Sequence, residues 1–389
     1  MNIQDQSKAI HMLDTKPHYA LLDGLRGVAA LMVVWYHVFE GFAFAGAING
    51  VGDGSITVFN HGYLAVDFFF MLSGFVISYA YDDRWDRLST WKFFTRRLIR
   101  LHPMLVVGAL IGLIAYCVGG CCDWSGHVTR WSHVLTAFVL AMLLIPMRPG
   151  AVSDVRGNGE MFPLNGPSWS LFFEYIGNIL YALVIRRLST KALAWLVGLL
   201  GIVFVGFAVG NASGYGCIGV GWTLDSVNFC GGLLRMLFPF TLGMLLQRTC
   251  RPAQMRGAFV VCTLLLFGVF SVPFLGANAH CSLNGVYEAV CILFIFPLIV
   301  LVTAGSSTTG KVVERSVRFL GNISYPLYIV HYPVMYLFYA WLIKHGLYSL
   351  SDAWYMVICV FVSSILLAYL CVKFYDIPLR QWLTKRFGK

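Results

Sequence analysis

Charged residues are scarce in this chain of 389 residues. They make up 12% of the sequence, whereas water-soluble domains usually carry about 25%. Hydrophobic residues reach 58% and aromatic residues 15%. A chain of this composition cannot give a soluble fold a polar surface, so water-soluble fold classes are excluded. The sequence instead predicts an all-α polytopic membrane protein.

Two motifs of soluble enzymes occur only as partial matches that lack the residues or the fold they require. Residues 214–219 match the spacing GxGxxG, but no βαβ unit surrounds them. Residues 305–311 approach a P-loop, but Val312 stands where the magnesium-binding hydroxyl belongs. The eleven cysteines show no metal-ligand spacing. We expect no metal and no permanently bound cofactor. The net charge of +10 is better explained by basic loops beside a membrane than by nucleic acid binding.

Long apolar segments make up most of the chain. Eleven occur, at about 21–44, 63–81, 103–120, 131–146, 168–185, 192–210, 233–247, 257–275, 286–304, 322–343 and 353–374. Clusters of Lys and Arg between them place both termini in the cytoplasm by the positive-inside rule. The number of crossings must then be even, so one segment of 103–120 and 131–146 does not cross. We expect ten spans, with the shorter 131–146 re-entrant or interfacial.

The resulting organisation has three parts. We expect a cytoplasmic tail at 1–20, a transmembrane domain at 21–376 and a basic cytoplasmic tail at 377–389.

The first apolar segment carries ionisable residues. Arg26 lies near its start and His37 lies eleven residues further on, which is roughly 16 Å along a helix. Eleven residues make almost three whole turns, so both side chains lie on one face. An ionisable residue within a span usually faces a cavity or a partner. A histidine satisfied by a neighbouring helix is the alternative reading of His37.

A basic cluster follows the second segment. Arg97 and Arg100 are three residues apart on a predicted helix and therefore share a face. Paired guanidinium groups are suited to phosphates, because each presents a planar fork of donors to an oxyanion. Ordinary topological charge is the alternative. Arg26 at a similar depth favours an anionic, phosphorylated ligand on the cytoplasmic side.

Three further ionisable residues are predicted at the depth of His37. Asp67 and Glu174 each lie five or six residues into spans that run inward, and His331 lies near the middle of its span. Two histidines and two carboxylates at one depth are enough for a buried acid/base site. The alternative for each carboxylate is a structural hydrogen bond between helices.

The residues predicted to bind the acceptor belong to no catalytic pattern, and each also has a common structural role. Arg235 is a basic residue near the start of a span, and it either binds an anionic acceptor or pairs with a carboxylate. Tyr325 and Trp169 are tentative acceptor contacts, although packing is the more common role of such residues.

Five motifs in order resemble the acyltransferase-3 family of membrane O-acyltransferases. They are DGLRG with YH eight residues later, VDFFFMLSGFVIS, RRLIRLHP, PSWSLFFE and NISYPLYIVHYP, and they cover about residues 20–380. The resemblance implies a ten-span domain in a bacterial inner membrane, acyl-CoA as co-substrate, and a carbohydrate or glycolipid acceptor. It also implies that Arg26, Arg97 and Arg100 bind the donor and that His37 is essential.

The sequence thus predicts transfer of an acyl group, with acetyl the expected one, to a hydroxyl of a surface polysaccharide or glycolipid. His37 would act as general base or as a transient acyl carrier. Asp67 or Glu174 would orient it, and His331 would protonate the leaving thiolate or bind acceptor. A proton-coupled transporter that uses the same buried groups is the alternative.

Overall fold

The computed structural model describes residues 19–56, 58–308 and 310–387. These residues form helices joined by loops, with no β-strand among them. The α-helices are α2 (Ala20–Ile48), α3 (Ala65–Tyr81), α4 (Thr90–Val118), α5 (Trp131–Met142), α6 (Ser168–Leu183), α7 (Thr190–Val209), α8 (Ser226–Thr249), α9 (Ala258–Ser271), α10 (Leu283–Val290), α11 (Phe296–Gly305), α12 (Lys311–His345), α13 (Leu350–Cys371) and α14 (Ile377–Phe387). Short helical turns are η1 (Gly62–Leu64), η2 (Trp85–Arg87) and η3 (Ile185–Arg187), and the π-helical turns η4 (Cys291–Ile295) and η5 (Val372–Asp376) join longer helices. The predicted tail at 1–20 lies almost wholly outside the described residues.

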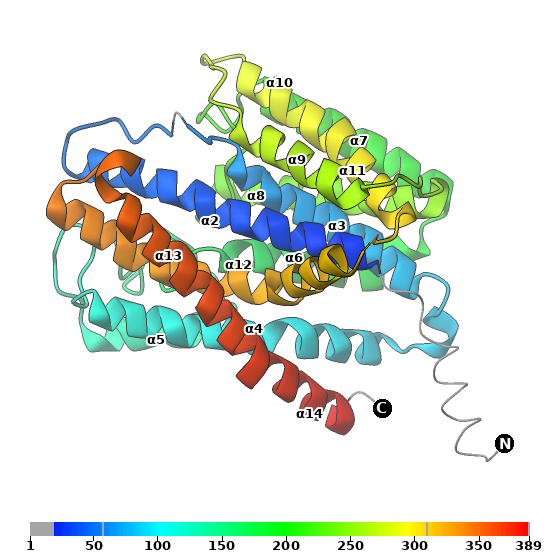
Figure 1. The fold of residues 1–389 in the computed structure, drawn as a ribbon, viewed down its shortest axis with the longest axis horizontal. Coiled ribbons are helices and arrows are strands. Elements are labelled where there is room, and N and C mark those ends of the chain that lie inside the picture. The colour runs from blue at the N-terminus through cyan, green and yellow to red at the C-terminus, as the bar shows by residue number, and fades with distance from the viewer. Residues whose placement is uncertain (1–18, 57, 309, 388–389) are drawn as a thin grey trace.

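The helices run between two ends of one bundle. In Figure 1, α2 and α12 lie side by side through its middle, and α4 and α5 lie together at its lower edge. We call the end where α2, α4 and α12 begin the arginine end, because Arg26, Arg97 and Arg100 lie there. The other end, where α2 and α4 finish, is the opposite end.

Nine helical segments among the described residues are long and apolar enough to cross a membrane. α9 has only fourteen residues, yet it also joins the two ends. The preceding α8 finishes at the arginine end, where Arg248 contacts Asp82 and the carbonyl of Leu188. The following α10 begins at the opposite end, against the last turn of α7. The all-α polytopic class is confirmed. The predicted orientation of the termini stays a prediction.

The segment around α5 returns to the end from which it starts. α4 finishes at the opposite end, and α6 must start away from the arginine end because its last turns contact Trp85 and Asp82 there. α5 therefore does not cross. The chain after α5 folds back into the bundle, where Asn165 donates to the carbonyl of Ile329. This agrees with the prediction that 131–146 is re-entrant.

Glycines allow the central helices to approach closely. A Cβ added at Gly27 of α2 would lie 2.3 Å from the backbone oxygen of Leu320 in α12. Gly74 of α3 and Gly243 of α8 face backbone oxygens across their own helix pair in the same way. Small residues at such crossings let membrane helices gain packing energy where lipid supplies no hydrophobic drive. These two contacts hold α2 against α12 and α3 against α8.

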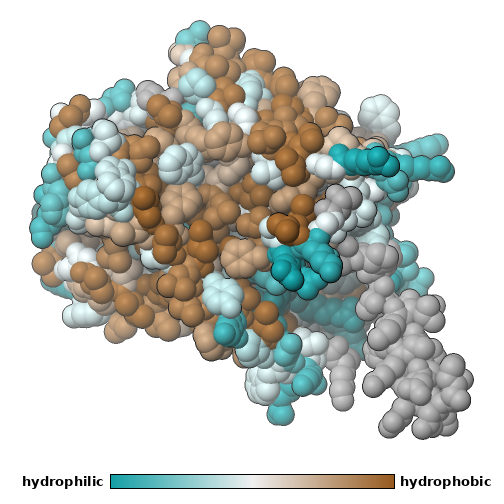
Figure 2. Space-filling view, viewed as in Figure 1, coloured by the Kyte–Doolittle hydropathy of each residue, from teal (hydrophilic) through white to brown (hydrophobic). Residues whose placement is uncertain are grey.

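The outer surface is largely apolar. Exposed side chains include Leu199, Leu264, Phe294 and Ile358, which lie on different helices. Figure 2 shows hydrophobic residues over the middle of one face, with hydrophilic residues toward its two edges. Such a band is expected of a protein surrounded by lipid.

Candidate active site

A cavity of about 940 Å³ lies at the arginine end, between α2, α3, α4, α6, α12 and α14. Six arginines outnumber the four carboxylates along its walls, so its lining is basic. The charged residues are Asp23, Arg26, Arg96, Arg97, Arg100, Glu174, Glu314, Arg318, Asp376 and Arg380. The three arginines that the sequence singled out are thus brought together in one cavity.

Arg97 and Glu174 form an ion pair inside this cavity. Nη2 of Arg97 lies 2.7 Å from Oε1 of Glu174, and the Ser73 hydroxyl donates to the same oxygen at 3.0 Å. The side chain of Arg97 is 7% exposed, and its Nε has no hydrogen-bond partner among the described residues. The prediction that Glu174 orients His37 is therefore wrong, because its carboxylate is held at the arginine end.

Two other cavity residues are held by hydrogen bonds between α12 and a neighbouring helix. Arg26 Nε donates to the Ser324 hydroxyl at 3.0 Å, while its Nη2 lies 3.0 Å from Asp23. Tyr325 donates its hydroxyl proton to the carbonyl of Leu101 at 2.6 Å. Tyr325 thus lines the cavity with the arginines, rather than a site reached from the opposite end.

The carboxylate beside His37 is Glu40, one turn further along α2. Nδ1 of His37 lies 2.6 Å from Oε2 of Glu40. The Tyr339 hydroxyl lies 2.7 Å from the same oxygen, and that of Tyr332 lies 3.4 Å from it. An ionised carboxylate only accepts hydrogen bonds, so Nδ1 carries a proton, and in the neutral imidazole the lone pair is then on Nε2. This arrangement leaves His37 ready to act as a base through Nε2.

His331 lies against His37. The ring centroids are 5.4 Å apart and the planes differ by 29°. Nδ1 of His331 lies 3.0 Å from the carbonyl of Leu327, and its buried Nε2 has no partner among the described residues. The two histidines were predicted at one depth, and they lie together. Arg26 and His37 share a face of α2, as their spacing predicted, and the structure shows that this face meets α12.

Asp67 belongs to a different cluster. Its carboxylate accepts from Nε and Nη2 of Arg235 at 3.1 and 2.6 Å, and both side chains are at most 1% exposed. The prediction that Asp67 could orient His37 is therefore wrong. Of the two readings left open for Arg235, the carboxylate pair is the correct one. Trp169 covers this arginine, with its ring centroid 5.3 Å from Cζ, and so has a packing role.

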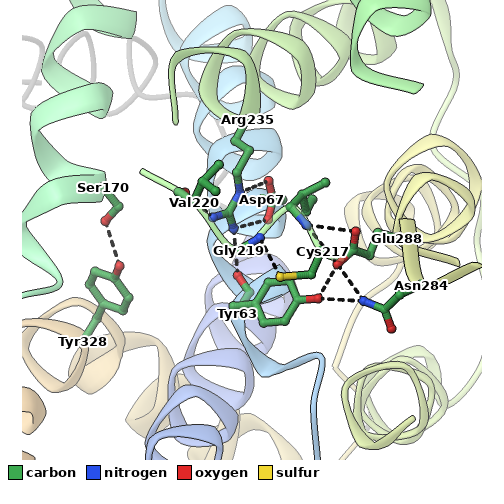
Figure 3. A network of polar contacts seen from close by, with 11 residues as sticks. Tyr63, Asp67, Ser170, Cys217, Gly219, Val220, Arg235, Asn284, Glu288 and Tyr328 are labelled. Carbon is green, nitrogen blue, oxygen red and sulfur yellow. Dashed lines mark hydrogen bonds and ion pairs between the residues drawn. The ribbon is translucent and has the colours of Figure 1, made fainter. Parts of the chain in front are cut away.

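Figure 3 shows how this ion pair continues into a network of buried polar groups. Arg235 also donates to the carbonyls of Val220 and Tyr63. The Tyr63 hydroxyl donates to Glu288, which also accepts from the backbone N–H of Ile218. The network joins α3, α8 and α10 to the loop before α8. Its hydrogen bonds satisfy the buried side chains of Asp67, Arg235 and Glu288, which gives these residues a structural role.

The inner wall of the cavity carries two hydroxyl groups. Ser170 Oγ and Tyr328 Oη are 2.7 Å apart, and Ser170 also donates to the carbonyl of Pro167 at 3.0 Å. Tyr328 packs edge-on against Phe69, whose ring centroid lies 5.5 Å away. On its other side, the Tyr328 ring lies 6.0 Å from that of His331. Tyr328 therefore stands between the cavity and the two histidines.

The re-entrant chain covers the histidines from the opposite end. The guanidinium of Arg156 stacks on Tyr336, with Cζ 3.5 Å from the ring centroid, and also faces Trp124 at 5.1 Å. Glu160 accepts a hydrogen bond from Tyr336. Burial raises the pKa of Glu160 to about 7, against the opposing effect of its hydrogen bonds and of Arg156.

Sequence reasoning missed the groups that complete the site. Glu40 lies three residues after His37, a spacing that puts two helical side chains side by side and that marks it as a partner. Tyr332 lies within the motif NISYPLYIVHYP and Tyr339 lies eight residues after His331, but residue type alone does not distinguish either of them from a packing residue. They are found only because α2 and α12 lie together.

Comparison with known proteins agrees with this geometry. A family model described as an acyltransferase domain matches residues 19–373. The chain belongs to the acyltransferase-3 family. As a member of this family, it is an integral membrane acyltransferase.

Several curated relatives are similar over different lengths. Acyltransferase MdmB of Streptomyces mycarofaciens is 27% identical over 81% of this chain and 78% of its own. Protein 2 in picA locus of Rhizobium radiobacter is 35% identical over 42% of this chain and 81% of its own. The peptidoglycan O-acetyltransferase OatA of Listeria monocytogenes is 24% identical over 81% of this chain, which spans 49% of that protein. No solved structure matches this chain.

Proposed function

We propose that this acyltransferase-3 protein transfers an acyl group, with acetyl the expected one, from acyl-CoA to a hydroxyl of a glycan or glycolipid. The observation that carries the proposal is a basic cavity at one end of α2 and α12, with the His37–Glu40 pair deeper along α2, where it packs against α12. The oxygen acceptor is suggested by the O-acetyltransferase OatA.

The donor would enter at the arginine end. The phosphates of CoA would lie against Arg26, Arg97 and Arg100, because guanidinium groups offer strong, charge-assisted hydrogen bonds to oxyanions. The pantetheine arm would then follow α12 inward. About eleven residues separate Arg26 from His37, or roughly 16 Å, which a pantetheine chain can largely cover.

The chemistry would take place at His37. Nε2 removes the proton of the acceptor hydroxyl while its oxygen attacks the thioester carbon, so a C–O bond forms and the C–S bond breaks. Glu40 holds the Nδ1 proton and stabilises the imidazolium that develops. The proton then passes to the thiolate of CoA, directly or through His331. Transfer through an acyl-imidazole on His37 is the second route, and it gives the same products.

The acceptor would approach from the opposite end. Glu40 and Tyr332 lie on that side of His37, near Trp124 of the loop before α5 and Arg156 of the re-entrant chain. Aromatic faces beside charged and hydroxyl groups are suited to a sugar, which has both apolar and hydroxyl-bearing surfaces. This region takes the place of Tyr325, Trp169 and Arg235 as the proposed acceptor region.

The proposal is tested with purified protein in lipid nanodiscs, acetyl-CoA labelled in the acetyl group, and lipid-linked glycan extracted from bacterial membranes. We expect CoA release together with alkali-labile label on the glycan. A His280→Ala variant serves as control for histidine loss, because His280 is exposed in a loop outside the site. Proton-linked uptake into proteoliposomes without any CoA release would instead support the transporter.

The same preparation separates the two chemical routes. Without acceptor, an acyl-imidazole would leave label on the protein after rapid acid quenching. Direct transfer predicts no label on the protein under these conditions.

A further inference from the structure

The inner wall of the cavity carries the hydroxyl groups of Ser170 and Tyr328, which have no part in the proposed proton transfer. Residues on α3, α6 and α12 line up there in layers one helical turn apart. The layer nearer the arginine end contains Ser73, Glu174 and Tyr325, and the deeper layer contains Phe69, Ser170 and Tyr328. Tyr325 and Tyr328 are about 4.5 Å apart along the helix axis, and His331 follows by the same step.

The two layers differ in polarity. The outer layer holds the Arg97–Glu174 ion pair, whereas the deeper layer is built of aromatic and aliphatic side chains. Its polar groups are the hydroxyls of Ser170 and Tyr328, which point toward each other from α6 and α12 in Figure 3. An apolar compartment with one hydroxyl pair suits a small apolar group that carries a single acceptor oxygen.

We propose that this compartment is the acyl subsite, and that Tyr328 donates a hydrogen bond to the acyl carbonyl oxygen. This rests on the proposed function. The Ser170 proton has two acceptors within reach, the carbonyl of Pro167 at 3.0 Å and Tyr328 Oη at 2.7 Å. When Ser170 donates to Tyr328 Oη, the Tyr328 proton becomes available to a ligand. Ser170 is then a positioning residue, and Tyr328 is the donor.

The reaction needs such a donor. Attack of the hydroxyl on the thioester turns the carbonyl oxygen into an oxyanion before the C–S bond breaks. A fixed donor aimed at that oxygen stabilises the transition state more than the ground state. Tyr328 keeps its own proton throughout, while the acceptor proton goes to His37 and then to the CoA thiolate. If His37 itself attacks the thioester, an Nε2–C bond forms as the C–S bond breaks, and Tyr328 stabilises the same oxyanion and again keeps its proton.

The distances are compatible with this placement. The Tyr328 ring lies 6.0 Å from the His331 ring, which lies 5.4 Å from that of His37. The path from the Tyr328 hydroxyl to the His37 imidazole contains a hydrogen bond to the carbonyl oxygen, the C=O bond, the approach of the attacking oxygen and a hydrogen bond to His37. Together these span roughly 9 Å. A thioester that is hydrogen-bonded to Tyr328 therefore brings its carbon within reach of a hydroxyl that is hydrogen-bonded to His37.

The compartment also sets the size of the acyl group. Phe69 packs edge-on against Tyr328, and Val66 and Phe70 line the same region of α3. With the carbonyl on Tyr328, the acyl chain points toward these side chains. In this placement the Phe69 ring limits the length of the acyl chain. Phe69→Ala is expected to raise kcat/KM for butyryl-CoA relative to acetyl-CoA by about 10-fold, because two more methylenes are buried.

The test of the donor is Tyr328→Phe, which removes one oxygen. We expect kcat for acetyl transfer to fall about 10²- to 10³-fold, with the acetyl-CoA KM changed less than about 3-fold. Tyr287→Phe is the matched control, because it removes a partly buried tyrosine hydroxyl that donates to the carbonyl of Val269 outside the site. Ser170→Ala should cost roughly 3- to 10-fold, and a larger loss than in Tyr328→Phe would make Ser170 the donor.

A spectroscopic measurement separates a hydrogen bond from a packing role. In the His37→Ala background, where the thioester should persist, infrared difference spectra with carbonyl-labelled acetyl-CoA report the bound C=O stretch. Adding Tyr328→Phe should move this band to higher frequency, because the carbonyl loses its donor. An unmoved band with unchanged kcat would overturn the assignment while leaving the proposed function intact. A wild-type protein that neither binds acetyl-CoA nor releases CoA would overturn the proposed function itself.

Discussion

Oε2 of Glu40 lies 2.6 Å from Nδ1 of His37, and the two residues are one turn apart on α2. The short contact fixes which imidazole nitrogen carries the proton and leaves the other as a base. In hydrolases with a Ser–His–Asp triad, a carboxylate in this position orients the imidazole and stabilises its charged form. Tyr339 anchors Glu40 from α12, so the pair depends on the contact between α2 and α12.

Replacement of Glu40 by glutamine tests this role. The amide preserves the size of the side chain and its contact with Tyr339, but it cannot compensate a positive imidazolium. We expect kcat to fall roughly 10²- to 10⁴-fold with little change in the KM for acetyl-CoA. Steady-state kinetics of CoA release measure both values. Wild-type kcat in this variant would show that Glu40 does not assist His37.

Arg100 provides a cleaner test of donor binding than Arg97. Arg97 neutralises the half-buried Glu174, so its loss also harms the fold. Arg100 lines the same cavity and forms no ion pair among the described residues. Arg100→Ala should raise the acetyl-CoA KM about 10- to 100-fold with kcat nearly unchanged, since a charge-assisted hydrogen bond contributes about 1.5–3 kcal/mol.

The control for Arg100 is Arg315→Ala, which removes an exposed arginine of α12 that does not line the cavity. Its KM should equal that of the wild type. Equal KM values for both variants would mean that the basic residues at this end serve topology alone.

The Asp67–Arg235 pair is expected to act on stability. Asp67→Ala leaves a buried guanidinium without its counter-charge, which costs on the order of 3–5 kcal/mol. The melting temperature of the detergent-solubilised protein should fall sharply. Asp67→Leu combined with Arg235→Met should recover much of it, because both charges are then removed. A variant Asp67→Ala with normal stability and no activity would place Asp67 in the catalytic machinery instead.

Glu160 should make stability depend on pH. Burial raises its pKa to about 7 in the folded protein, from about 4.5 when exposed. Between these values the folded state binds more protons than the unfolded state, so stability falls as pH rises through this range.

The matched variant is Glu160→Gln, which keeps an oxygen for Tyr336 and cannot ionise. Melting temperatures measured from pH 5 to pH 8 should decline less in this variant than in the wild type. Parallel curves for the two proteins would contradict the raised pKa of Glu160.

The helix-forming segments and much of the arginine end follow from the sequence, because they depend on local spacing. Arg26 and His37 share a face of α2, and the R-x-x-R spacing places Arg97 and Arg100 together. Depth along a span is also readable, and it correctly placed His331 near His37. Depth alone does not say toward which neighbour a side chain points.

That missing direction explains the two wrong assignments. Asp67 faces α8 and Glu174 faces α4, since α3 and α6 are rotated by packing contacts far apart in sequence. The close approach of α3 and α8 through Gly74 is one such contact. Glu40 lies inside the first apolar segment at 21–44, three residues after His37, and this spacing alone could have identified it as a partner.

The most direct test of the account is a single-turnover measurement on His37→Ala with saturating labelled acetyl-CoA and glycan acceptor, together with the affinity for CoA. We expect CoA to bind as in the wild type, because the arginine cavity is untouched, while acetyl transfer falls at least about 10³-fold. His280→Ala should behave as the wild type. Transfer by His37→Ala at a rate near that of the wild type would contradict the account.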